Sequence, residues 1–84
     1  MRGSDFAELK AFMAVVERQS FARAAEHLGL SPSALSQTIR QLEGRIGARL
    51  LNRTTRSVAP SASGELLYRR IAPLFREMAA AVAE

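Results

Sequence analysis

Residues 20–47, SFARAAEHLGLSPSALSQTIRQLEGRIG, predict two helices joined by a turn of about three residues. Apolar and small side chains recur at i, i+3, i+4 and i+7 from Phe21, which is the spacing of one helix face. Ser20 is a candidate N-cap of this first helix, and Gly29 follows it where a left-handed C-cap residue is expected. Two helices connected in this way match the helix-turn-helix pattern.

The second helix of the pair, about residues 32–46, carries two different faces. Ser31 is its predicted cap, Pro32 takes the first helical position, where its missing N–H costs nothing, and Gly47 ends the helix. The apolar face holds Leu35, Ile39, Leu42 and Ile46, and the opposite stripe holds Ser33, Ser36, Gln37 and Arg40.

The polar stripe predicts a DNA-reading surface. In a helix-turn-helix the second helix enters the major groove with its N-terminal residues at the base edges. Gln pairs there with adenine, Ser reaches most bases, and Arg takes guanine or a phosphate. The alternative is an ordinary solvated face, but such faces usually mix Glu and Lys, and this stripe has neither.

A helix is also predicted ahead of this pair, from Asp5 to about Arg18, because apolar residues keep a helical spacing there. Asp5 is placed as its cap, and Glu8, three residues later, completes the spacing of a capping box.

A small hairpin, or wing, is predicted after the pair, at about residues 49–59. Two very short strands, about 49–52 and 57–59, flank the polar turn NRTTR, and Pro60 ends the second strand. Arg53 and Arg56 at its tip could reach phosphates or an adjacent minor groove. The alternative is a polar turn without a partner.

The last segment, residues 61–84, is predicted to be a long linker helix. Its apolar seam, Leu67, Ile71, Leu74, Met78 and Val82, has the spacing of a partner-helix interface. A dimer through this helix is one interpretation, and packing against its own domain is the other. Pro73 predicts a bend near residues 69–73, with the helix continuing beyond it.

Composition narrows the class of protein. The chain has 84 residues, a net charge of +4, no cysteine and one histidine, His27. A disulfide or thiolate metal site is excluded, and no apolar run or signal peptide indicates a membrane or export, so we expect a cytoplasmic protein without cofactors. No nucleophile–base pair or paired carboxylates predict an enzyme.

The positive charge is concentrated in one region. Seven arginines and only two glutamates fall between residues 18 and 56. A local basic patch favours a polyanion such as DNA, although a solvated surface would give the same count.

Three motifs carry a family resemblance: F-x-x-V-x-E-x-x-S-F-x-x-A-A-x-x-L, S-A-L-S-x-x-I-x-x-L-E-x-x-I-G and L-L-x-R-T-x-R. With them, residues 5–84 resemble the N-terminal DNA-binding domain of LysR-type transcriptional regulators. The resemblance implies a mainly α fold, a winged helix-turn-helix of three helices and a two-stranded wing followed by a linker helix. It also implies a homodimer on an interrupted inverted repeat of double-stranded DNA. The small-molecule sensing domain with which the family normally continues is absent here, and we expect an effector only for that domain.

The resemblance also assigns residues. Base contacts fall on Pro32, Ser33, Ser36 and Gln37, the wing contact falls on Arg56, and backbone contacts fall on Arg53 and Thr54. From their place at the start and on the polar stripe of the reading helix, we expect Ser31 and Arg40 to contact the backbone as well. The family often has Gln in place of Pro32 and Arg in place of Gln37, so the preferred half-site is expected to differ from the commoner type.

The predicted organisation is a leader at 1–4, a winged helix-turn-helix at 5–60 and a dimerisation helix at 61–84. A winged helix used as a protein–protein adapter is the rival function, which would bind DNA weakly and without sequence preference.

Overall fold

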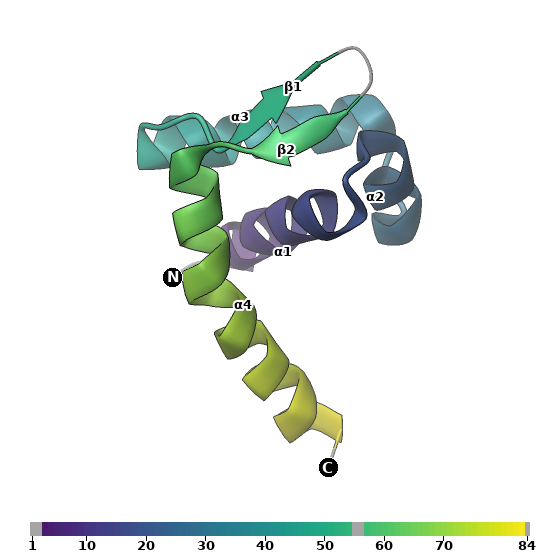
Figure 1. Cartoon of the computed structure of the whole chain (residues 1–84). Helices are drawn as coiled ribbons and strands as arrows, with labels where there is room; N and C mark the ends of the chain where they lie inside the picture. The colour runs from purple at the N-terminus through teal and green to yellow at the C-terminus, as the bar shows by residue number, and fades with distance from the viewer. Residues whose placement is uncertain (1–2, 55–56, 84) are drawn as a thin grey trace.

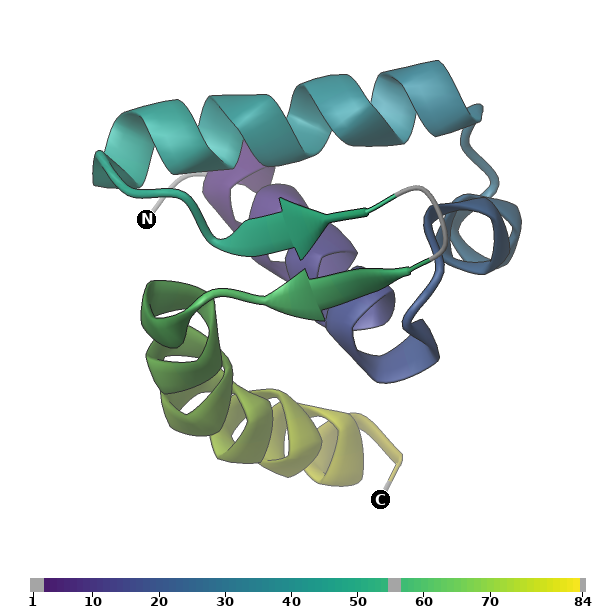
Figure 2. The same ribbon diagram turned by 45° about the horizontal axis from the view of Figure 1, so that its top comes forward.

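The computed structural model describes residues 3–54 and 57–83, with only the backbone described for Ser4. Its elements, in chain order, are α1 (Gly3–Arg18), α2 (Phe21–Leu28), α3 (Pro32–Ile46), β1 (Leu51–Arg53), β2 (Val58–Pro60) and α4 (Ala62–Ala83) (Figure 1). The two strands form one antiparallel hairpin beside α3. α4 follows β2 and projects from the end of the hairpin opposite its turn (Figure 2). The predicted mainly α winged helix-turn-helix with a long C-terminal helix is confirmed.

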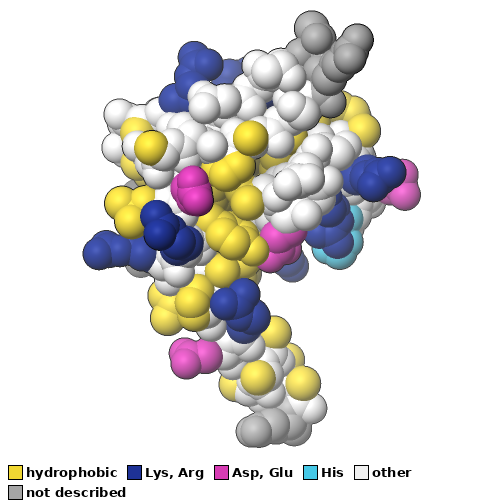
Figure 3. Space-filling model, in the orientation of Figure 1, with side chains coloured by type: hydrophobic (Ala, Val, Ile, Leu, Met, Phe, Trp, Pro, Cys, Tyr) yellow, Lys and Arg dark blue, Asp and Glu magenta, His cyan; other side chains and the backbone are white. Residues whose placement is uncertain are grey.

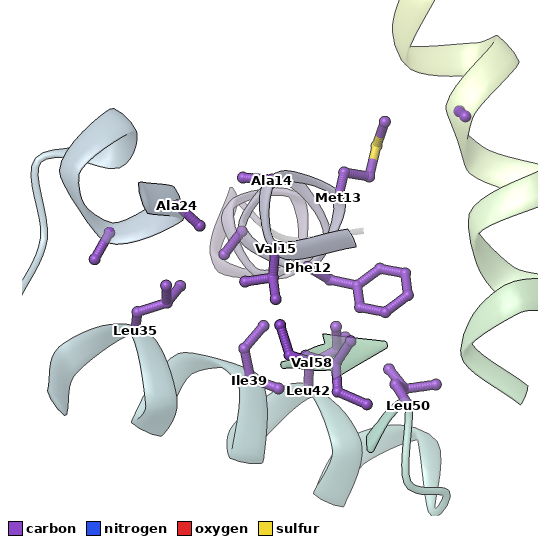
Figure 4. Packing of buried hydrophobic residues seen from close by; sticks show 14 residues of the cluster. Phe12, Met13, Ala14, Val15, Ala24, Leu35, Ile39, Leu42, Leu50 and Val58 are labelled. Carbon is purple, nitrogen blue, oxygen red and sulfur yellow. The ribbon is translucent and has the colours of Figure 1, made fainter. Parts of the chain in front are cut away.

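The hydrophobic core lies where α1, α3 and the wing meet. Phe12 and Val15 of α1 are fully buried; Val15 points toward Ile39 of α3, and the Phe12 ring points toward Leu50 (Figure 4). Ala24 and Ala25 of α2 are also buried, because small side chains let a neighbouring helix cross closely. Leu42, Leu50, Leu51 and Val58 close the core beneath the wing.

The local signals that begin and end α2 and α3 act as predicted. The Ser20 hydroxyl accepts a hydrogen bond from the Arg23 N–H at 3.2 Å, which caps α2. Ser31 caps α3 by accepting from the Ala34 N–H at 3.1 Å. Gly29 ends α2 with a φ of 71°, a left-handed conformation that glycine adopts without steric cost.

The start of α1 differs from the prediction. The helix begins at Gly3, so Asp5 lies in its first turn and is not its cap. Asp5 and Glu8 both pair with Arg45 at the end of α3. The Nη1 of Arg45 lies 2.8 Å from an Asp5 oxygen, and its Nη2 pairs with the buried Glu8 carboxylate. The hydrogen bond to Glu8 raises the pKa of Arg45. The predicted capping box is wrong because these carboxylates tie α1 to the end of α3.

The wing is shorter and slightly later in the chain than the sequence predicts. β1 and β2 pair Leu51 with Pro60 and Arg53 with Val58, so Pro60 belongs to the second strand. The carboxylate of Glu43 accepts hydrogen bonds from the N–H groups of Leu50 and Leu51, at 2.8 and 3.2 Å. These amides are therefore bound to α3, and the strand begins at Leu51.

Ser61 joins the wing to α4. Its hydroxyl donates to the Arg49 carbonyl at 2.6 Å and accepts from the Gly64 N–H at 3.0 Å, so it caps α4 as well. Its own N–H donates to the Leu50 carbonyl at 2.9 Å. The first turn of α4 lies directly against this carbonyl, since a Cβ atom on Gly64 would come within 2.0 Å of the Leu50 oxygen.

α4 packs on the domain with its first half and extends away with its second half (Figure 1). Ala72 is buried, the rings of Phe6 and Phe75 stack at 4.9 Å, and the Tyr68 hydroxyl donates to Glu17 at 2.8 Å. Pro73 lies inside the helix, which continues to Ala83 as predicted and changes direction part-way along in Figure 1. Among the residues described, no helix combines the length and apolar character needed to cross a membrane.

Candidate nucleic-acid interface

The exposed face of α3 carries the predicted reading residues. Ser33, Gln37 and Arg40 are exposed and Ser36 is half-buried, whereas Leu35 and Ile39 on the opposite face are buried. Ser31 and Pro32 are also exposed at the N-terminal end, which suits the backbone and base contacts predicted for them. The structure therefore brings the predicted base-contacting residues onto one accessible surface, with hydroxyl, amide and guanidinium groups outward.

Arg53 connects the wing to this surface. Its Nη1 donates a hydrogen bond to the Ser36 hydroxyl at 3.1 Å. Its guanidinium carbon lies 3.9 Å above the centre of the Phe21 ring, a cation–π contact with α2. Arg53 is therefore held against both helices of the pair. No short stretch of sequence indicates this contact, because the three residues are distant in the chain.

The wing turn is closed by its own hydrogen bonds. The Thr54 N–H donates to the Ser57 carbonyl at 2.8 Å, and the Ser57 N–H donates to the Thr54 hydroxyl at 3.0 Å. Thr54 is exposed beside the strands, as a backbone contact requires. The wing contact predicted at Arg56 lies outside the described residues.

Positive charge converges between α3 and the wing. Arg40, Arg49 and Arg53 line an open, polar hollow of about 250 Å³. Glu43 also lines it, but its carboxylate already accepts the two amides at the start of the wing. Arg45 contributes less to the basic region than the sequence count suggests, since it pairs with Asp5 and Glu8. The hollow can attract an anion such as a phosphate.

The apolar seam of α4 divides into two parts. Leu67 and Ile71 are half-buried and pack on the chain's own core, so the second interpretation, packing against its own domain, holds for the first half of the seam. Leu74, Met78 and Val82 are exposed on the projecting half, where hydrophobic side chains are visible (Figure 3).

An apolar hollow extends this surface onto α1. It has a volume of about 420 Å³, and its lining includes Phe6, Phe75, Met78 and Val82. In the sequence, Phe6 belongs only to the apolar spacing that predicts the first helix. Its ring stacks on Phe75, which follows the seam residue Leu74, and an aromatic side chain beside the seam is the signal that points to this surface.

The comparisons with known proteins agree with this geometry. The family model described as "Bacterial regulatory helix-turn-helix protein, lysR family" matches residues 6–65. The chain belongs to this family. It is a LysR-type helix-turn-helix DNA-binding domain, and its curated relatives are transcriptional regulators.

Two relatives illustrate the similarity in sequence. The regulator PgrR of Escherichia coli K12 is 46% identical over 83 residues, which cover 99% of this chain and 28% of PgrR. The regulator CrgA of Neisseria meningitidis serogroup B is 46% identical over 77 residues, covering 92% of this chain and 26% of CrgA. The chain thus spans about a quarter of the length of these relatives.

Several similar solved structures of LysR-type regulators contain DNA. The DNA-binding domain of BenM on catB site 1 DNA has a TM-score of 0.83 and 35% identity, covering 92% of this chain and 86% of that chain. Vibrio fischeri DarR in complex with DNA has a TM-score of 0.80 and 26% identity, covering 99% of this chain and 28% of that chain. The arrangement of helices and wing is therefore shared with proteins that have been seen on DNA.

Proposed function

We propose that this chain binds double-stranded DNA sequence-specifically as a homodimer, as the DNA-binding part of a transcription regulator. The observation that carries the proposal is the exposed stripe of Ser33, Gln37 and Arg40 on a helix whose other face is buried. A helix with such a stripe can enter the major groove without disturbing the core. The DNA complexes of BenM and DarR support the same use of the fold.

The proposed contacts divide into reading and positioning. Pro32, Ser33, Ser36 and Gln37 face the base edges, where Pro32 offers only apolar contact, for example with a thymine methyl, and Gln37 favours adenine. Ser31, Arg40, Arg53, Thr54 and Arg56 contact the sugar–phosphate backbone or the minor groove. Phosphate contacts fix the register of the protein, and base contacts choose the sequence.

The proposed dimer uses the projecting half of α4. Leu74, Met78 and Val82 are exposed there and would lose water-accessible apolar surface against a second copy. Two copies related by a twofold axis would read an interrupted inverted repeat. We propose that the chain acts in the cytoplasm, without catalytic activity and without membrane contact. We propose a small-molecule effector only for a further domain of a full-length regulator.

Selection from a random duplex pool at physiological salt, followed by sequencing, tests the proposal. The expected result is enrichment of an inverted repeat. Enrichment of a single half-site would support the reading role of α3 and contradict the proposed dimer. Binding that is lost as salt rises, with no enriched sequence, would favour the protein–protein adapter.

Gln37→Ala sharpens the test at one residue. The variant is expected to lose about 1–3 kcal/mol of discrimination at one base position while other positions keep theirs. Gln41→Ala is the matched control, since Gln41 is also exposed on α3 but lies one turn further from its N-terminus. Unchanged relative affinities for all sequences in Gln37→Ala would show that Gln37 does not read DNA.

A further inference from the structure

The Ser36 hydroxyl has a restricted choice of hydrogen bonds. A serine hydroxyl offers one donor and two acceptor lone pairs, whereas a guanidinium can only donate. In the contact at 3.1 Å, Arg53 must therefore be the donor and the Ser36 oxygen the acceptor. The hydroxyl proton of Ser36 is directed away from the guanidinium.

The structure leaves this proton free to point outward. Thr38, two residues later, uses its hydroxyl to donate to the Ala34 carbonyl at 2.9 Å. Ser36 makes no corresponding bond, and within residues 3–54 and 57–83 its contact with Arg53 is the only hydrogen bond of its side chain. The nearby positive charge also strengthens the hydroxyl as a donor.

The position of Arg53 is set by more than this one bond. Its guanidinium carbon lies 3.9 Å from the centre of the Phe21 ring, and Phe21 packs against the core. A planar group held by a cation–π contact and by a directional hydrogen bond presents its donors in a fixed orientation, which a lysine ammonium cannot reproduce. Arg53 uses one donor on Ser36, so others remain for a phosphate.

We infer that Arg53 determines specificity as a positioning residue, by making Ser36 a hydrogen-bond donor toward the major groove. A donor at this point favours the acceptors of guanine, adenine N7 or thymine O4, and disfavours cytosine, which presents an amino donor. The inference rests on the proposed DNA binding and adds to it the chemistry by which one position is read.

The test compares base preferences by selection and sequencing at one salt concentration. The proteins are the unmodified chain, Ser36→Ala, Arg53→Lys, Arg53→Met and the double variant Ser36→Ala/Arg53→Met. Ser36→Ala is expected to reduce discrimination against cytosine by about five- to tenfold at one position. Both Arg53 variants should reduce the base preference at the same position. The double variant Ser36→Ala/Arg53→Met should show no weaker preference there than Ser36→Ala alone.

Arg49→Met is the matched control for lost charge. Arg49 is an exposed arginine just before the wing and lines the same polar hollow as Arg53. We expect weaker binding at all sequences and an unchanged base preference. Thermal unfolding of every variant identifies any that fail to fold. If Arg53→Met does not fold, Arg53→Lys provides the comparison.

Three outcomes would overturn the inference. Arg53 variants that weaken binding uniformly but keep the preference set by Ser36 would make Arg53 a phosphate contact alone. Additive flattening in the double variant would show that the two residues read independently. An unmodified chain that enriches no sequence would instead remove the proposed function, which distinguishes that failure from the other two.

Discussion

Replacing Gly64 with alanine tests how tightly α4 is joined to the wing. Alanine is the better helix former by about 1 kcal/mol, so on helix propensity alone the substitution would stabilise the protein. The structure predicts the opposite. The new Cβ would lie 2.0 Å from the Leu50 carbonyl oxygen and 2.9 Å from its carbonyl carbon, and these are backbone atoms.

The Leu50 backbone cannot move away without losing other contacts. Its N–H is bound by Glu43 and its carbonyl by the Ser61 N–H. Overpacking costs about 1–3 kcal/mol, and each of these hydrogen bonds contributes about 1 kcal/mol. After subtracting the gain of about 1 kcal/mol in helix propensity, we expect a net loss of roughly 2–4 kcal/mol. For a domain of this size each kcal/mol lowers Tm by about 4–8 °C.

Circular dichroism during thermal and urea unfolding measures the effect. Gly44→Ala is the control, because Gly44 also lies inside a helix but has no atom near its would-be Cβ. It should gain up to about 1 kcal/mol in stability. If Gly64→Ala unfolded at or above the temperature of the unmodified protein, the close approach of α4 to Leu50 would be refuted.

Three other substitutions test contacts that reach across the fold. Glu43→Ala should cost about 2–3 kcal/mol of unfolding free energy in urea, since two partly buried amides lose their acceptor; equal stability would refute the role of Glu43. Tyr68→Phe should cost about 0.5–1.5 kcal/mol near pH 8 by removing the bond to Glu17. The pKa of Tyr68 is raised, mainly by burial and then by the hydrogen bond to Glu17. The stabilisation by this bond is therefore complete below pH 10 and is lost as pH rises through the folded-state pKa. A cost of Tyr68→Phe that persists above that pKa would contradict this role of the bond. Met78→Lys should weaken the proposed dimer in ultracentrifugation without lowering Tm, because Met78 is 46% exposed, and an unchanged dimer would exclude this part of α4 from the interface.

Local patterns accounted for most of the fold. The boundaries of α2 and α3 follow from capping residues such as Ser20 and Ser31, whose hydrogen bonds reach only three residues along the chain. Amphipathic spacing likewise placed the core face of α3. These signals are contained in short windows of sequence, so the chain alone was enough to find them.

The failures involve partners far apart in the chain. Asp5 resembled a cap because nothing nearby showed that Arg45 would fold back to it. The contact of Arg53 with Ser36 spans 17 residues and depends on how the wing packs. The candidate reading residues could be placed on one helix face, but the hydrogen bonds that orient them appear only in three dimensions.

The junction at Ser61 couples the direction of α4 to the wing. Since one serine both ends the wing and caps the helix, no slack segment separates the two. The 22 residues of α4 span about 33 Å, so a turn of about 10° at the junction displaces its far end by roughly 6 Å. By the same geometry, a small displacement imposed at that end reaches the wing and α3 as a change of angle.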